Sequence, residues 1–275
     1  MSNCKVIALT NQKGGVGKTT TAVNLGVSLV QQGKNVLLID ADAQANLTMA
    51  LGYNRPDDIP ITLSTVMQNI IDDKTLDVSQ GIIHHSEGVD LLPSNIEMSG
   101  FEVRLINAMS RERVLKTYVN EVKKNYDYVL IDCMPSLGMI TINALAAADS
   151  VIIPTQPHYL SAKGLELLLR SVSMVKRQIN PKLRIDGILM TMVMPRTNIS
   201  KEITATVKSA YGKKIKVFDT EIPHSIRAVG ATAEGKSIFA YDKSGKVAAA
   251  YEQLGKEVAE IGEKQRNQNR ADRIR

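Results

Sequence analysis

The feature that most constrains the fold is an alternation of short apolar runs, rich in β-branched residues, with longer segments of helical periodicity. Runs of this length and composition are typical of buried strands. Their alternation with helices indicates a parallel sheet covered on both faces. The runs are residues 5–10 (KVIALT), 35–40 (NVLLID), 89–93 (VDLLP), 128–132 (YVLID), 150–155 (SVIIPT) and 184–193 (RIDGILMTMV), with 217–222 (VFDTEI) as a possible edge strand.

Helices are expected between these strands and at the end of the chain. The helical segments are residues 19–32, 111–125, 140–147, 160–179, 199–211 and 246–261. The last of them carries an apolar stripe at spacings of three and four, so it should pack on the body of the protein. We therefore predict a single α/β domain over residues 1–262, with a mostly parallel twisted sheet flanked by helices. The basic polar tail, residues 263–275, is expected to be disordered.

The composition supports a globular protein that stays in the cytoplasm. A chain of 275 residues, 44% of them hydrophobic, can bury a sizeable core. The sequence has no apolar run long enough for a bilayer, and its start does not resemble a signal peptide. Cys4 and Cys133 lie in strand-like runs, so we expect buried, inert thiols.

The net charge of +6 is unevenly distributed. Residues 1–137 carry a net charge of −3, whereas residues 138–275 carry +9. A basic half can be a solvated surface, or it can bind an anionic partner such as nucleic acid, and the charge alone leaves both readings open.

Residues 11–20 (NQKGGVGKTT) have the pattern of a phosphate-binding loop, with Gln12 where the usual pattern has glycine. The loop follows a strand and opens a helix, so its backbone N–H groups should converge on a polyphosphate. Lys18 should reach the β and γ phosphates, and the Thr19 hydroxyl should bind Mg²⁺. This predicts a P-loop NTPase whose nucleotide-binding residues are Lys13, Gly14, Gly15, Val16, Gly17, Lys18, Thr19 and Thr20.

Carboxylates follow two of the predicted strands. Asp40 and Asp42 end the run at 35–40, and Asp132 ends the run at 128–132. Aspartates at strand ends can simply cap a turn. Beside a phosphate loop they are candidates to hold the metal and to position water.

Together these motifs resemble the ParA/Soj family of partition ATPases, which have a deviant Walker A loop. The segments that carry the resemblance are KGGVGKTTTAVNL, LLIDADAQAN, YVLIDCMPSLG, INALAAADSVIIPTQ, MTMVMPRTNIS and IPHSIRAVGATAEGKSIFAYD. The resemblance implies a slow ATPase for the segregation of a plasmid, a chromosome or a mobile element. Its ATP-sandwich homodimer would bind double-stranded DNA nonspecifically, associate with the nucleoid, and be released when a ParB-like partner stimulates hydrolysis.

The resemblance also implies roles for individual residues. Lys13 would cross to the other subunit and neutralise phosphate charge there. Asp42 would orient the attacking water, whereas Asp40 and Asp132 would support Mg²⁺ with Thr19. The adenine contacts would be Met192, Ile222 and Pro223, and the DNA contacts Arg196 and Arg227, which lie in segments expected to be exposed loops.

Some positions depart from the family pattern, and one other function stays open. Met134, His158 and His224 stand where proline, glutamate and arginine are common, which suggests a divergent branch. The tail lacks the amphipathic pattern of a MinD-type membrane anchor, so no membrane partner is expected. The alternative is an ATP-dependent positioning or regulatory switch of the same fold that acts on a protein cargo.

Overall fold

The computed structural model describes residues 4–75, 77–157, 161–195 and 197–274. Within them, one sheet has the strand order β3-β4-β2-β5-β1-β6-β7, and every neighbouring pair is parallel except β3 with β4. The predicted mostly parallel α/β fold is confirmed. The strands are β1 (Lys5–Leu9), β2 (Val36–Ala41), β3 (Ile83–His84), β4 (Asp90–Leu92), β5 (Tyr128–Cys133), β6 (Ser150–Thr155) and β7 (Arg184–Met190).

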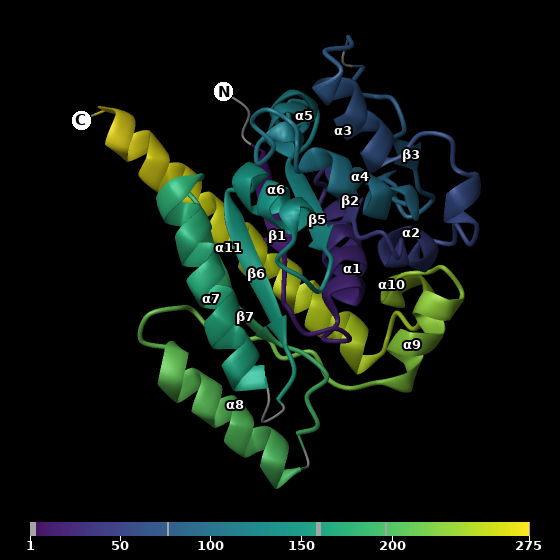
Figure 1. Cartoon of the computed structure of the whole chain (residues 1–275). Helices are drawn as coiled ribbons and strands as arrows, with labels where there is room; N and C mark the ends of the chain where they lie inside the picture. Colours follow the sequence, from purple (N-terminus) through teal and green to yellow (C-terminus); the bar gives the residue numbers. More distant parts are fainter. Residues whose placement is uncertain (1–3, 76, 158–160, 196, 275) are drawn as a thin grey trace.

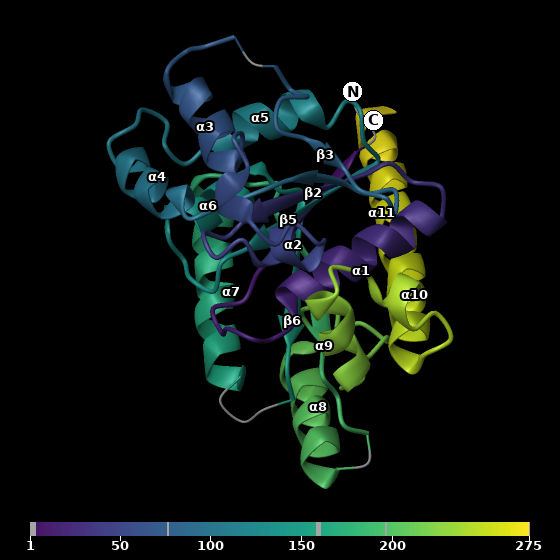
Figure 2. The ribbon, with the colours of Figure 1, turned by 90° about the vertical axis from the view of Figure 1, so that its right-hand side faces the viewer.

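Helices cover both faces of this sheet, as Figures 1 and 2 show. One face packs against α1 (Lys18–Gln31), α2 (Asn46–Ala50), α9 (Ile226–Ala233), α10 (Ile238–Tyr241) and α11 (Lys246–Ile274). The other face packs against α3 (Leu63–Ile71), α4 (Glu97–Leu105), α5 (Val114–Val122), α6 (Met139–Ala147) and α7 (Ser161–Gln178). The short 3-10 helix η1 (Pro56–Asp58) follows α2, and α8 (Asn198–Tyr211) follows β7.

Side chains of each strand alternate between the two cores. In β5, Val129 and Ile131 join the core under α3 to α7, whereas Tyr128 and Leu130 join the core under α1 and α11. Successive residues of a strand point to opposite faces. A strand that is buried on both faces therefore has a nearly continuous apolar sequence, which is why these runs could be recognised.

The C-terminal helix is longer than the sequence indicated. It continues to Ile274, so its predicted end near Ile261 is wrong, and residues 263–274 are helical. Gln265 Nε2 donates a 2.9 Å hydrogen bond to Asp186 Oδ1, and Lys5 Nζ lies 2.6 Å from the other oxygen of that carboxylate. These contacts hold the polar end of α11 against the amino ends of β1 and β7.

Two other segments differ from the predictions. Residues 217–223 lie along β7 and the residues after it, but they form only isolated bridges, Ile188 with Val217 and Val193 with Pro223. The proline has no N–H to extend the pairing. The short helices α2 and α9 were not expected. Gly52 and Gly235, which follow the ends of these helices, lie in close backbone contact: a Cβ atom built on Gly235 would lie only 2.3 Å from Gly52 Cα.

The prediction of a buried thiol is confirmed for Cys133 and only in part for Cys4. Cys133 is buried and Cys4 is half-buried, and neither forms a disulfide. Burial raises the pKa of Cys4 to about 12, so its thiol stays protonated at neutral pH. Among the described residues, no helix combines the length and the apolar character that crossing a membrane requires.

Candidate functional site: the phosphate loop and its carboxylates

Residues 11–17 connect β1 to α1 at the carboxyl end of the sheet. Gly15 and Gly17 have φ values of +69° and +81°, a region that other residues adopt only with strain. Asn11 anchors the start of the loop: its Nδ2 donates to the Pro154 carbonyl at 2.8 Å, and its Oδ1 accepts from the Lys13 N–H at 3.0 Å. The glycine pattern and the buried asparagine together fix the path of the backbone.

Lys18 lies inside the loop. The residue is 7% exposed, and its Nζ lies 3.5 Å from the Lys13 carbonyl oxygen. Burial lowers the pKa of Lys18, and the charges of Asp132 and Asp42 oppose this shift. A desolvated ammonium in this position gains most from an anionic ligand.

Thr19 and Asp132 meet at the start of α1. The Thr19 hydroxyl donates a 2.6 Å hydrogen bond to Asp132 Oδ2, while Oδ1 of this buried carboxylate has no hydrogen-bond partner among the described residues. Burial first, and then the neighbouring Asp40, raise the pKa of Asp132 to about 8. A divalent cation would relieve this excess of negative charge, so these residues fit Mg²⁺, which commonly binds one or two carboxylates together with water and phosphate.

Asp40 has a structural role as well as a place beside the site. It pairs in register with Asp132, and burial raises its pKa to about 7. Its Oδ2 accepts from the Thr48 N–H and hydroxyl at 2.9 and 2.7 Å, and its Oδ1 accepts from the Asp42 N–H at 3.2 Å. Among the described residues it makes no hydrogen bond to Thr19, so its support of the metal stays a prediction.

In the described part of the chain, Asp42 makes fewer hydrogen bonds than Asp40. Its side chain accepts one 2.9 Å hydrogen bond, from the Gln44 N–H, and the residue is 8% exposed. Its charge acts on both Lys18 and Asp132, so it lies close to the loop.

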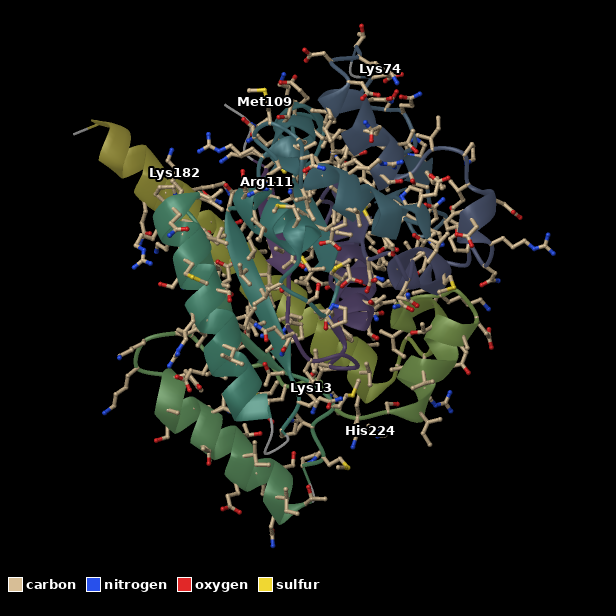
Figure 3. All side chains as sticks on the ribbon, viewed as in Figure 1. Lys13, Lys74, Met109, Arg111, Lys182 and His224 are labelled. Atoms are coloured by element: carbon tan, nitrogen blue, oxygen red, sulfur yellow. The ribbon has the colours of Figure 1, made fainter. Side chains whose placement is uncertain are left out.

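The second lysine of the loop, Lys13, has no side-chain partner among the residues that the structure describes. Lys13 is half-buried at the carboxyl end of the sheet (Figure 3), and within the described part of the chain its ammonium makes no ion pair or hydrogen bond. The next residue, Gly14, has no positive φ, and a Cβ there would meet nothing within 4 Å. Nothing in the described structure therefore requires glycine at this position. Val16 is buried and Thr20 half-buried at the same turn.

The predicted adenine contacts lie together after β7. The Val193 N–H donates to the Ile222 carbonyl at 2.9 Å, and Val193 also bridges Pro223, which brings both residues beside Met192. Met192 has a φ of +53° and its Cε lies 3.8 Å from a Cβ built on Gly17. Met192 therefore adjoins the phosphate loop, and Ile222 and Pro223 are linked to it through Val193.

Two residues that contact the loop were assigned no site role by the sequence. Gln156, after β6, donates from Nε2 to the Gly15 carbonyl at 2.8 Å. Thr191, after β7, donates from its hydroxyl to the Val16 carbonyl at 2.8 Å. Neither belongs to the loop motif, but both lie in segments that carry the resemblance to the ParA/Soj family, INALAAADSVIIPTQ and MTMVMPRTNIS.

Of the two predicted DNA contacts, one can be located. Arg227 is not in a loop but is the second residue of α9, which begins after the N-cap Ser225. Its side chain is 66% exposed and its Nε lies 3.4 Å from Asp242 Oδ2. Arg196 and His158 lie outside the described residues, and His224 is exposed.

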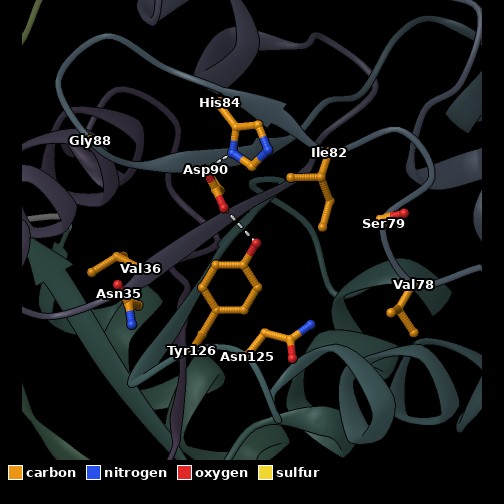
Figure 4. Close-up of a pocket in the computed structure, with 10 residues that line it drawn as sticks. All are labelled: Asn35, Val36, Val78, Ser79, Ile82, His84, Gly88, Asp90, Asn125 and Tyr126. Carbon is orange, nitrogen blue, oxygen red and sulfur yellow. Dashed lines mark hydrogen bonds and ion pairs between the residues drawn. The ribbon is translucent and has the colours of Figure 1, made fainter.

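A separate hollow of about 460 Å³ lies at the opposite end of the sheet. In Figure 4, Asp90 lies between His84 and Tyr126, with hydrogen bonds of 2.5 Å from His84 Nδ1 and 2.6 Å from the Tyr126 hydroxyl. Each carboxylate oxygen of Asp90 therefore has a hydrogen-bond partner. The described residues hold no cluster of three or more His, Cys, Asp or Glu side chains arranged for a metal, here or at the loop.

Comparisons with known proteins agree with this geometry. Residues 4–185 match the AAA domain family. The chain is 44% identical to the sporulation initiation inhibitor protein Soj of Bacillus subtilis, over 94% of this chain and 99% of Soj. It is 37% identical to the chromosome partitioning protein ParA of Caulobacter vibrioides, over 92% and 93% of the two chains.

Among solved structures, it superimposes on cobyrinic acid a,c-diamide synthase from Mycobacterium smegmatis with bound ADP and magnesium, with a TM-score of 0.80 and 34% identity over 92% and 93% of the chains. The family match covers well over half of the chain, and the likeness to Soj and ParA is nearly complete in length. The chain belongs to the ParA/Soj family of partition ATPases.

Proposed function

We propose that this partition ATPase is an ATP-controlled DNA-binding switch. Two chains close around ATP, and the dimer binds double-stranded DNA without sequence preference at the nucleoid in the cytoplasm. Hydrolysis, stimulated by a ParB-like partner, then releases the dimer. The observation that carries the proposal is the pair of residues Lys13 and Gly14, a cation and a glycine for which the described chain has no use.

The residues around the loop divide the chemistry among them. ATP and Mg²⁺ are the cofactors, and Mg²⁺ supplies positive charge that the phosphates need during hydrolysis. Lys18 binds the β and γ phosphates, while Thr19 and Asp132 hold the metal. Asp42 orients the attacking water and accepts its proton, which general-base catalysis by a carboxylate allows.

The open surface at Gly14 supports closure between two subunits. Among the described residues, a Cβ atom there would meet nothing within 4 Å, so the absence of a side chain leaves room for the approach of a second molecule. Lys13 would then reach phosphate oxygens bound by the partner. A cation supplied only in the dimer stabilises the charge of the transition state only in the dimer, which makes hydrolysis dependent on assembly.

The distribution of charge supports DNA as the ligand. The half of the chain after residue 137 carries the +9 excess, and the exposed Arg227 lies in it. Its ion pair with Asp242 is no obstacle, because exposed pairs of this kind contribute only about 0–1 kcal/mol. Arg196, which lies outside the described residues, stays a second proposed DNA contact.

The test is a titration of fluorescent duplex with the Asp42→Ala variant and ATP, at several salt concentrations. Binding should need ATP, should be absent with ADP or in Lys18→Ala, and should weaken linearly in a plot of log affinity against log salt concentration. Duplexes of unrelated sequence should bind equally. Absence of ATP-dependent binding at low salt would instead favour the alternative, a switch that positions a protein cargo.

A further inference from the structure

Three side chains, one from the loop itself and two from distant segments, lie within hydrogen-bond distance of backbone carbonyl groups of the phosphate loop. Lys18 Nζ lies 3.5 Å from the Lys13 oxygen, Gln156 Nε2 lies 2.8 Å from the Gly15 oxygen, and the Thr191 hydroxyl lies 2.8 Å from the Val16 oxygen. The last two donors come from segments more than 130 residues away in sequence. The conformation of the loop is therefore set in part by the ends of β6 and β7.

The held carbonyl groups determine where the loop's N–H groups point. A peptide group is planar and trans, so the carbonyl oxygen of one residue and the N–H of the next point in opposite directions. Fixing the Gly15 oxygen on the side of Gln156 directs the Val16 N–H to the other side. In the same way, Thr191 directs the Gly17 N–H. Converging N–H groups are what binds phosphate in such a loop.

Gln156 is suited to this task by its donor group. Its Nε2 lies 2.8 Å from the Gly15 oxygen and 2.7 Å from Met192 Sδ, and both neighbours are acceptors. A glutamate would place an acceptor against two acceptors, and its charge would lie beside a polyphosphate. The position therefore needs a side chain of this length with an N–H donor.

We propose that Gln156 is a positioning residue that orients the Val16 N–H toward the nucleotide's phosphates and ties the loop to Met192. Gln156 acts through the backbone of residues 15 and 16 and does not itself touch the substrate. This assignment rests on the proposed function, since it concerns the binding of ATP. It extends the site beyond the loop motif to the end of β6.

The test compares Gln156→Met, which keeps the length and removes the donor, with Gln253→Met, the same change at an exposed position of α11. Affinities for ATP and for tripolyphosphate are measured by displacement of a fluorescent ATP analogue. Loss of one neutral hydrogen bond predicts that Gln156→Met weakens both ligands by the same factor, about fivefold to tenfold. Gln156→Glu should weaken both further, and Gln253→Met should match the parent.

A purely structural role would lower the thermal unfolding midpoint of the nucleotide-free protein, which we expect to be unchanged in Gln156→Met. Parent-like affinity of that variant for both ligands would overturn the assignment while leaving the ATPase intact. Weaker ATP binding with unchanged tripolyphosphate binding would also overturn the assignment. In that case Gln156 would affect the binding of adenine through Met192, and not the binding of the phosphates. If the parent binds neither ligand, the proposed function fails as well.

Discussion

The Thr19 hydroxyl donates a 2.6 Å hydrogen bond to Asp132 Oδ2, and Asp132 Oδ1 has no partner among the described residues. The pair joins the first turn of α1 to the end of β5. One oxygen of the carboxylate holds the threonine in position, and the other remains for a ligand. An unpaired buried carboxylate oxygen lowers the stability of the folded protein, and the binding of a cation can offset this loss.

Asp132→Asn should stabilise the protein in the absence of nucleotide and Mg²⁺. Burial and Asp40 raise the pKa of Asp132 from 3.8 to about 8, so between these pH values the folded state keeps a proton that the unfolded state has lost. The contribution of Asp132 to stability therefore falls as pH rises through this window. Urea denaturation should give the variant an advantage of more than about 1 kcal/mol at pH 8 that shrinks toward pH 4. An equal difference at both pH values would contradict this.

Lys18→Ala and Asp42→Ala should separate binding from hydrolysis. Loss of the buried ammonium should abolish ATP binding, because no other cation of the described loop lies inside it. Asp42→Ala should bind ATP and hydrolyse it at least about a hundredfold more slowly, the usual scale for loss of a general base. Steady-state phosphate release measures this. Hydrolysis at the parent rate would show that another group positions the water.

Lys13→Ala and Gly14→Val should bind nucleotide as monomers. The first removes the cation that reaches the partner's phosphates, and the second fills the space between the two loops. Light scattering with a non-hydrolysable ATP analogue measures the dimer fraction. The matched control is Lys182→Ala, an exposed lysine away from the loop. A parent-like dimer fraction in both loop variants would rule out the sandwich arrangement.

Arg227→Ala should weaken DNA binding without changing ATP binding or dimerisation. Each phosphate contact is lost twice in a dimer, so affinity for arbitrary duplex should fall by about tenfold or more at physiological salt, and the salt slope should decrease. Arg196→Ala should have a smaller effect of the same kind. Arg55→Ala, an arginine whose side chain is 87% exposed in the acidic half, is the control.

The ion pair between Arg227 and Asp242 allows a second test of this prediction. Asp242→Asn removes the carboxylate that lies 3.4 Å from Arg227 Nε, so it should leave DNA binding unchanged or strengthen it. If neither Arg227→Ala nor the double change at Arg196 and Arg227 alters affinity, the DNA surface lies elsewhere, and Lys201 and Lys246 become the candidates.

The sequence was most informative where one local rule governs the structure. The run that ends in Asp40 is apolar because both faces of β2 are buried, and the loop around Lys18 is fixed by glycines that only a tight turn needs. Such features can be read without knowing what packs against them.

Features that depend on distant contacts could not be predicted in this way. The end of α11 is polar, but Gln265 donates a hydrogen bond to Asp186 of β7. The sequence around Gln265 gives no sign of that partner. Helix α9 had a readable signal that was missed, since Ser225 is an N-cap and Gly235, with a φ of +65°, follows the helix end. Gln156 donates a hydrogen bond to a loop residue 141 positions earlier in the chain, and its family segment INALAAADSVIIPTQ gives no sign of that contact.

The contact between Gly52 and Gly235 has a consequence for communication through the molecule. Asp40 holds Thr48 in α2 and the backbone of Asp42, and α2 leads directly to Gly52. Gly235 follows the helix that carries Arg227. Because two backbones meet there without side chains between them, no rotamer can absorb a displacement, and any shift of the Asp42 segment that moves α2 must either move α9 with it or break the contact.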